Sequence, residues 1–177
     1  NMPFKGTIMA ILISPMIVPL IITSAGMFFF YSKIGLTHTY LGLILAHTAL
    51  GTPFVVITVT ATLTGFDTNL IRASQSLGAD TMRTFFKVIM PLILPGVISG
   101  ALFAFITSFD EVVVVMFIGS VEQITIPKQM WAGLRQETSP VILCMATCLV
   151  FLSIALLTTV ELLRRRSESL RGIKLRN

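Results

Sequence analysis

The sequence predicts an all-α membrane protein, a polytopic bundle of helices, and three observations support this fold class. Apolar residues make up 54% of the 177 residues, only 12% carry a formal charge, and the mean hydropathy is +0.89. About 25% of the residues of a soluble domain are charged, so an ordinary water-soluble globule is excluded. Apolar runs long enough to span a bilayer recur along the chain, and the basic residues gather between or after them. Intrinsic disorder is also excluded, because nearly every stretch has apolar side chains to bury.

Four apolar runs are predicted to cross the membrane as helices, since one crossing takes about 20 residues. The first contains Pro15 and Pro19, which membrane helices tolerate where neighbouring groups satisfy the freed backbone carbonyls. It lacks the small-residue cleavage site of a signal peptide, so we interpret it as a span. The predicted spans are residues 7–31, 40–63, 88–108 and 140–163.

The third run must be interrupted, because apolar sequence continues from Val88 past Asp110 and Glu111 to Ile118. At about 1.5 Å per residue, one helix over this whole stretch would be far longer than a bilayer is thick. We therefore predict that the spanning helix ends near Ser108 and that a short, partly embedded segment follows.

The basic residues predict the side of the membrane that each segment faces. With an inside N-terminus, ten of the 13 Lys and Arg residues fall in the N-terminal flank, the 64–87 loop and the 164–177 tail. This is the positive-inside bias of inner-membrane proteins. We expect a multi-pass protein of the plasma (inner) membrane, with both termini of this chain in the cytoplasm and an outer loop at residues 119–139. The concentration of charge in the tail fits a membrane flank better than a surface for nucleic acid.

Small and polar residues inside the spans indicate helix packing. Gly96 and Gly100 form a small-residue stripe that lets another helix approach closely. Thr48 and Thr52 lie on one helix face and are candidates to line a path, although threonines commonly bond their own helix backbone. His47 is expected to hydrogen-bond a neighbouring helix.

The outer segment from Glu122 to Glu137 is predicted to form an amphipathic helix near the lipid headgroups. It holds Trp131, the single tryptophan of the chain, as an interfacial anchor. His38 is placed in an outer loop, and two isolated histidines make no metal site.

The 64–87 loop has the pattern of two short helices joined by a glycine. Asp67 or Thr68 can cap the first helix, Gly78 stands where a helix ends with positive φ, and Asp80 can cap the second. A short helix with a small-residue face suits a groove on another protein, and the alternative is a helix that lies on the membrane surface. The residues at the i, i+3, i+4, i+7 spacing of one face are Leu70, Ala73, Ser74 and Leu77.

Residues 72–91 resemble the EAA loop of binding-protein-dependent ABC importer permeases. That pattern is Glu-Ala-Ala, three residues, Gly, nine residues, Ile, one residue and Leu-Pro, and its spacing is intact over these twenty positions. Arg72 reverses the charge of the family's leading glutamate. The outright matches are Ala73, Gly78 and Pro91, and the mild replacements are Ser74, Val88 and Met90.

The resemblance extends over essentially the whole chain and is strongest to permeases of the polyamine (spermidine/putrescine) type, the second of two membrane subunits. Since that family usually has six spans, the resemblance implies a type I ABC importer permease fold whose first two helices are absent here. The residues that carry it are Ser108 to Val114, Ser14-Pro15 with Val18-Pro19, and Ile126-Pro127 with Trp131.

The resemblance implies the pore subunit of an ATP-driven importer for a small solute, with a polyamine as the best match. Its implied partners are a cytoplasmic ATP-binding subunit, a second permease subunit, an extracytoplasmic solute-binding protein and the lipid bilayer. The loop would be the coupling helix that sits in a cleft of the ATP-binding subunit, and we hypothesise that Gly78 is its hinge. The contact residues implied for the loop are Arg72, Ala73, Ser74, Leu77 and Gly78.

Asp110 and Glu111 are the acidic pair within the long apolar stretch. An ionised carboxylate at mid-bilayer costs at least about 2.5 kcal/mol, so such a residue faces a cavity, a partner or the interface. One interpretation is that one or both line the substrate path and attract a cation. The other is that they mark the water-exposed outer end of the span. Adjacent helical residues diverge by about 100°, so both cannot face a pore equally unless the helix breaks.

No enzymatic motif is present in the sequence. A Walker A loop is missing, so we expect that the chain binds no cofactor itself and that ATP is bound by the partner subunit. Three alternatives to a polyamine importer stay open. The first is an importer of the same family with a different cargo. The second is a secondary transporter driven by an ion gradient, with Asp110 and Glu111 as coupling sites. The third is a non-transporting membrane anchor or assembly factor.

Overall fold

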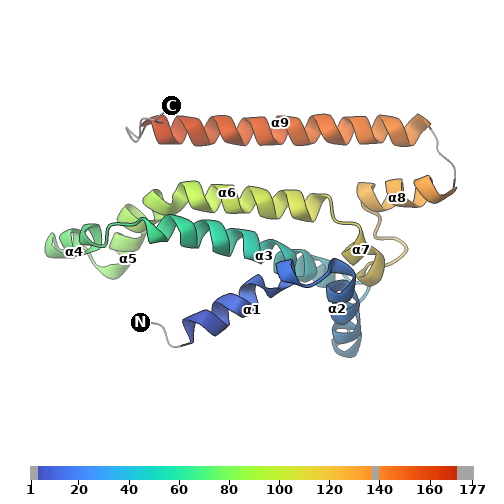
Figure 1. Cartoon of the computed structure of the whole chain (residues 1–177), viewed down its shortest axis with the longest axis horizontal. Helices are drawn as coiled ribbons and strands as arrows, with labels where there is room; N and C mark the ends of the chain where they lie inside the picture. Colours follow the sequence, from blue (N-terminus) through green and yellow to red (C-terminus); the bar gives the residue numbers. More distant parts are fainter. Residues whose placement is uncertain (1–3, 137–139, 171–177) are drawn as a thin grey trace.

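The computed structural model describes residues 4–136 and 140–170, and over these residues the regular secondary structure is entirely helical. Long helices lie side by side and shorter ones cap both ends of the assembly (Figure 1). The elements in chain order are α1 (Lys5–Ile17), α2 (Leu20–Ile34), α3 (Tyr40–Thr64), α4 (Asn69–Ser76), α5 (Thr81–Thr84), the π-helical turn η1 (Phe85–Ile89), α6 (Met90–Phe109), α7 (Val113–Ile118), α8 (Ile126–Gln136) and α9 (Pro140–Leu170).

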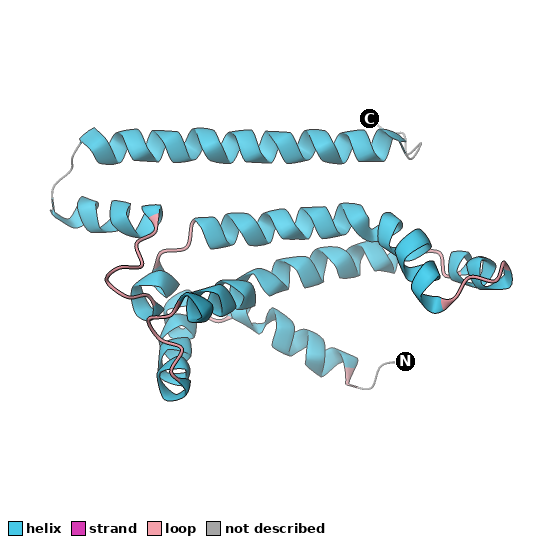
Figure 2. Ribbon diagram, turned by 180° about the vertical axis from the view of Figure 1, so that it is seen from behind, coloured by secondary structure: helices cyan, strands magenta, loops and turns pink. Residues whose placement is uncertain are grey.

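The pairing of α3 with α6 forms the centre of the fold, and both views show the two helices side by side (Figures 1 and 2). Glycines of α6 make this close approach possible. A Cβ built on Gly100 would lie 2.7 Å from Cα of Val55, and one on Gly96 would lie 3.0 Å from Cβ of Thr62. The predicted small-residue stripe is therefore confirmed as a packing surface, and its partner is α3.

The first predicted span is not one continuous helix. α1 and α2 meet at an angle of 110°, and Val18 between them is extended, with φ −76° and ψ 136°. The cause is Pro19, since a residue before proline avoids the helical region and proline itself lacks the N–H that a helix needs. Pro15, by contrast, sits inside α1. The described residues contain three helices long and apolar enough to cross a membrane, or four if the bent pair counts as one span.

The predicted break after the third span is confirmed. α6 ends at Phe109 and α7 follows from Val113 to Ile118. At its other end the helix begins earlier than predicted, because α5, η1 and α6 run on without interruption over Thr81–Phe109.

A small apolar core lies where α2, α3 and α7 meet, at the end of α3 opposite α4. It consists of the buried residues Tyr31, Ala46, Leu50, Val114 and Ile118. The turn before α3 is fixed to this core, because the backbone N–H of His38 donates to the carbonyl of Ile118 at 2.8 Å. The short α7 is thus a packed part of the fold rather than a loose loop.

The C-terminal part consists of α8 and α9. The predicted outer amphipathic helix is present as α8, although it begins at Ile126 rather than Glu122, and Glu137 lies outside the described residues. α9 packs against α6 and α8 and continues beyond the predicted span to Leu170. Part of the predicted 164–177 tail is thus helical, and its residues 171–177 lie outside the described part of the chain.

Candidate coupling elbow and solute groove

The segment from Asp67 to Thr84 forms an elbow, two short helices joined at a glycine, at the end of α3 and α6 remote from the core (Figure 1). Its first helix, α4, starts where the Asp67 carboxylate accepts the backbone N–H of Asn69 at 2.9 Å. Thr68 occupies the capping position but makes no side-chain cap bond. Of the two predicted caps, Asp67 is the one that bonds.

Gly78 ends α4 as predicted. Its φ is +82°, in the left-handed region that favours glycine. The Gly78 N–H donates to the carbonyl of Gln75 at 3.0 Å, and the Ala79 N–H donates to that of Ser74 at 3.1 Å. These two bonds form a Schellman motif, which satisfies carbonyls left free at a helix end.

The second helix of the elbow begins at its predicted cap. The Asp80 carboxylate accepts the backbone N–H of Arg83 at 2.6 Å. One turn later the Thr84 hydroxyl lies 3.0 Å from that of Ser74, across the elbow on α4. Thr84 is 2% exposed. The loop pattern did not single out Thr84, because its proximity to Ser74 depends on the angle between α4 and α5.

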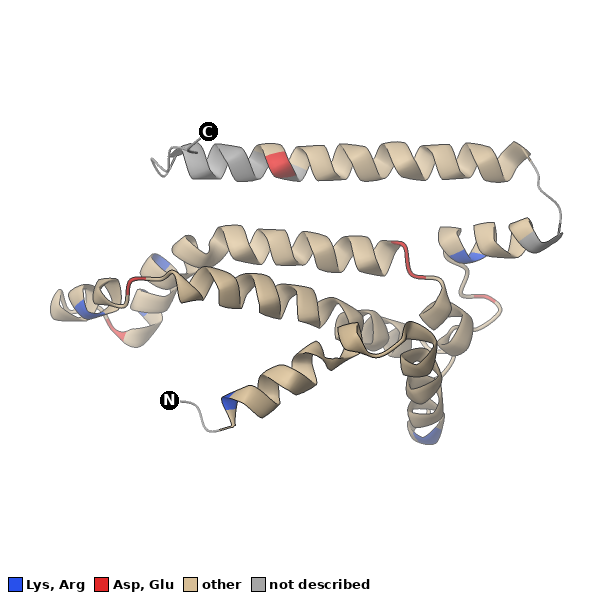
Figure 3. Ribbon diagram, viewed as in Figure 1, with Lys and Arg blue, Asp and Glu red and all other residues tan. Residues whose placement is uncertain are grey.

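Four of the five predicted contact residues lie on the surface of the elbow: Arg72, Ala73, Leu77 and Gly78. The fifth, Ser74, is half-buried and faces Thr84. Leu77 is 89% exposed and Met82, on the second helix, is 69% exposed. Basic and acidic residues also gather here (Figure 3). The elbow therefore presents large apolar side chains beside charges, and Met82 is a surface residue that the sequence pattern missed.

A groove of about 970 Å³ opens at the other end of α3 and α6. Its floor is formed by these two helices, and the segment before α8 closes one side. Its polar and aromatic lining residues are Tyr40, His47, Thr48, Thr52, Phe105, Ser108, Phe109, Glu122, Gln123 and Thr125.

His47 bonds a neighbouring helix, as predicted. Its Nδ1 lies 2.9 Å from the hydroxyl of Ser108 on α6, and the Glu111 carboxylate interacts electrostatically with the ring. Thr48 and Thr52 both line the groove, and each donates its hydroxyl to the carbonyl four residues earlier, at 2.7 Å. The groove is therefore weakly polar along one face of α3.

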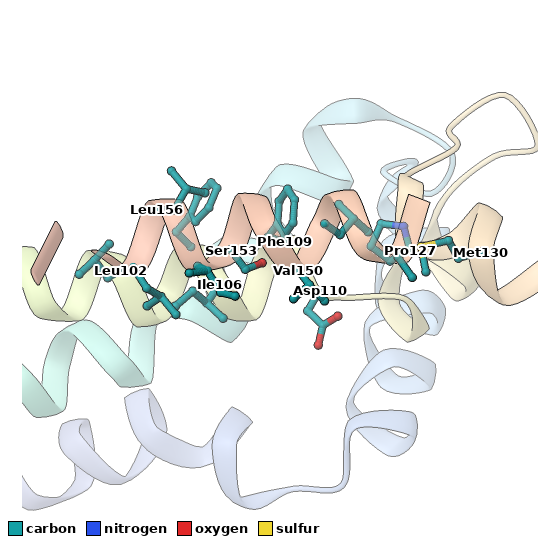
Figure 4. Close-up of a pocket in the computed structure, with 14 residues that line it drawn as sticks. Leu102, Ile106, Phe109, Asp110, Pro127, Met130, Val150, Ser153 and Leu156 are labelled. Carbon is teal, nitrogen blue, oxygen red and sulfur yellow. The ribbon is translucent and has the colours of Figure 1, made fainter. Parts of the chain in front are cut away.

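Asp110 and Glu111 have different surroundings. Glu111 is 7% exposed, and its Oε1 accepts the backbone N–H of Val114 at 2.8 Å, at the start of α7. Asp110 is exposed and lies at a separate, largely apolar cavity of about 410 Å³ between α6, α8 and α9. Figure 4 shows its carboxylate pointing away from the apolar side chains that line this cavity. The two carboxylates thus have separate surroundings, and Glu111 lines neither cavity.

Metal ligands do not gather in the part of the chain that the structure describes, where no three His, Cys, Asp or Glu side chains lie close enough to hold an ion. Cys144 and Cys148 are free and exposed on α9.

Apolar helices long enough to cross a membrane, an exposed helical elbow at one end and a groove at the other define a helical membrane protein (Figure 1). The chain belongs to the family of binding-protein-dependent transport system inner membrane components, whose family model matches residues 1–169. It is accordingly a multi-pass inner-membrane protein of a transport permease family.

Curated relatives are permeases of polyamine transport systems. The spermidine/putrescine transport system permease protein PotC of Haemophilus influenzae is 30% identical over 164 residues, which cover 93% of this chain and 64% of that protein. For PotC of Escherichia coli K12 the identity is also 30%, covering 92% and 61%. The putrescine permease PotI of the same strain is 28% identical over 145 residues, covering 77% and 51%. The chain therefore spans less than two thirds of the length of these relatives.

A solved structure supports the fold independently. An inward-facing structure of the MetNI methionine ABC transporter matches with a TM-score of 0.72 and 22% sequence identity, covering 92% of this chain and 73% of that one. The predicted all-α bundle of the ABC importer permease type is therefore confirmed.

Proposed function

We propose that this chain is part of the membrane-spanning permease subunit of an ATP-driven importer and that its elbow docks onto a separate ATP-binding subunit. The observation that carries the proposal is the exposed apolar surface of the elbow. Leu77 is 89% exposed and Met82 69% exposed at the end of the molecule, beside the exposed Arg72. Large apolar side chains grouped with charges on a short helix are typical of a helix that enters a groove on a partner.

The elbow transmits movement because its second helix is continuous with a span. α5, η1 and α6 form one uninterrupted helix over Thr81–Phe109, so displacement of the elbow displaces the wall of the groove. ATP is bound and hydrolysed by the partner. The ATP-bound and ATP-free states differ in how closely the elbows of the two permease subunits approach each other. This difference in contacts is what biases the permease between its two states. The positive-inside bias of the basic residues supports a cytoplasmic position for the elbow and for both termini of this chain.

The proposed cargo is a small organic cation of the polyamine class, handed over by an extracytoplasmic binding protein to a pair of permease subunits. Support comes from the polyamine transport systems to which the PotC and PotI relatives belong and from the groove, which combines aromatic rings with hydroxyls and Glu122. Aromatic faces and carboxylates are the groups that attract ammonium ions. Asp110 is a second candidate for the path, at the mouth of the neighbouring cavity. Glu111 is a weaker candidate, because its carboxylate is already bonded at the start of α7.

The test is co-purification of the full-length permease with the ATPase from the same source. The variant is Leu77→Asp, and the matched control is Val121→Asp, since Val121 is 90% exposed at the opposite end of the molecule. We expect the control to retain the ATPase and Leu77→Asp to lose it, as does a deletion of residues 68–79. If the wild-type permease binds no ATPase and takes up solute without one, the gradient-driven alternative replaces this proposal.

A further inference from the structure

The two helices of the elbow are joined twice, once by the chain at Gly78 and once by a pair of hydroxyls. Oγ of Ser74 on α4 lies 3.0 Å from Oγ1 of Thr84 on α5. The Ser74 hydroxyl already donates its proton to the carbonyl of Ile71 at 2.8 Å. Since a hydroxyl carries one proton and can accept two bonds, Thr84 is the donor to Ser74.

The position of Thr84 makes this bond costly to lose. Its side chain is 2% exposed, so water cannot replace Ser74 as the partner, and a buried hydroxyl without a partner is destabilising. Thr84 is also the last residue of α5, at the entry to the π-helical turn that leads into α6. A contact at this point connects α4 to the start of the spanning helix.

Without this contact, the angle between α4 and α5 would depend on the turn around Gly78 and on the packing of α4 against η1. Glycine has the widest conformational freedom of all residues, and a Cβ built on Gly78 would meet nothing within 4 Å. The two backbone bonds of the Schellman motif are then what holds this turn, and no neighbouring side chain supports it at Gly78. A second attachment between Ser74 and Thr84 closes the elbow into a ring of residues 74–84 and fixes its angle.

We propose that Ser74 and Thr84 are positioning residues that hold α4 and α5 at a fixed angle. A displacement of α4 by the ATPase is then transmitted in full to α6. The inference rests on the proposed function and deepens it. The elbow then turns as one piece about its junction with the membrane helices, and Gly78 sets its shape instead of serving as the hinge. Ser74 was expected to touch the ATPase, and on this proposal its hydroxyl acts inside the elbow.

The functional experiment is done on the full-length permease reconstituted with its ATPase and binding protein. The quantity measured is the number of solute molecules transported per ATP hydrolysed. For Thr84→Val we expect the ATPase to stay bound while this ratio falls about fivefold, the factor by which losing one hydrogen bond shifts a two-state equilibrium. Thr84→Ser keeps the hydroxyl and should restore the ratio. Thr64→Val is the matched control, because that hydroxyl bonds only the carbonyl of Thr60 in its own helix.

A distance measurement tests the lock without relying on transport. Spin labels are placed on the exposed Gln75 and Lys87, one on each side of the elbow, after the exposed Cys144 and Cys148 are replaced by Ser. We expect one narrow distance distribution for the wild type and Thr84→Ser, and a broad one for Thr84→Val. If Thr84→Val does not fold, Ser74→Ala breaks the same bond from the half-buried side.

The outcomes separate the two proposals. A narrow distribution and an unchanged transport ratio in the variants that lack the bond would overturn the lock while the importer stands. A wild-type permease that binds no ATPase overturns the importer, and the spin labels still report whether the elbow is rigid.

Discussion

Nδ1 of His47 on α3 and Oγ of Ser108 on α6 are 2.9 Å apart, and this bond joins the two central helices beside the groove. The glycine contacts lie further along the same helix pair, toward the elbow. α3 and α6 are thus held by close backbone packing over much of their length and by one polar bond near the end that faces the proposed cargo.

Ser108→Ala should weaken this end of the helix pair. It removes the hydroxyl that the half-buried imidazole bonds, and the loss of one hydrogen bond costs about 0.5–1.5 kcal/mol. We expect a lower midpoint of thermal unfolding in detergent. Thr159→Ala is the control, since that threonine is exposed and bonds only the carbonyl of Ala155 in its own helix. Equal midpoints for the two variants would mean that the His47 bond does not stabilise the fold.

Gly100→Ala should push α3 and α6 apart. The new Cβ would lie 2.7 Å from Cα of Val55, and a backbone atom cannot turn aside as a flexible side chain does. Overpacking of this kind costs about 1–3 kcal/mol. The measurement is again thermal unfolding, and Gly65→Ala is the control, because a Cβ there meets nothing within 4 Å. A Gly100→Ala protein as stable as the Gly65→Ala protein would contradict the close packing.

Asp110 and Glu111 should respond differently to loss of charge. Glu111→Gln keeps an oxygen that can accept the Val114 N–H, so we expect normal stability and normal uptake. Glu111→Ala removes the bond and should cost about 1 kcal/mol of stability, as for other caps.

Asp110→Asn leaves the fold unchanged, because Asp110 is exposed, and should weaken uptake of a cationic solute if Asp110 lines the path. The checks are thermal unfolding and the solute concentration at half-maximal uptake. A loss of uptake in Glu111→Gln with stability intact would restore Glu111 to the substrate path.

The sequence was sufficient for the elements whose signals are local. Gly78, Asp80 and the break after Phe109 follow from capping chemistry and from the length of a helix against a bilayer, and the structure has all three. The bend at Val18 was missed, although Pro19 was noted, because tolerance of proline in membrane helices was weighed above the restriction that it places on the preceding residue. The Ser74 to Thr84 bond was out of reach, because it depends on the angle between α4 and α5, which spacing along one helix does not encode. The sequence also left open which of Asp110 and Glu111 is buried, because that depends on how α7 packs against α2 and α3.

Substitution of Gly78 should strain the elbow without crowding it. The residue has φ +82° and open space around its Cβ position, so the cost is conformational, about 1–2 kcal/mol for a residue with a side chain. Asn tolerates the left-handed region better than β-branched Val. We therefore expect Gly78→Asn to retain most ATP-driven uptake. Gly78→Val should reach the membrane in normal amounts but uncouple ATP hydrolysis from uptake, because α4 no longer meets α5 at the angle that the partner requires. The measurement is uptake and ATP hydrolysis on the same reconstituted complex. Normal coupling in Gly78→Val at normal expression would show that the shape of this turn does not matter for transport.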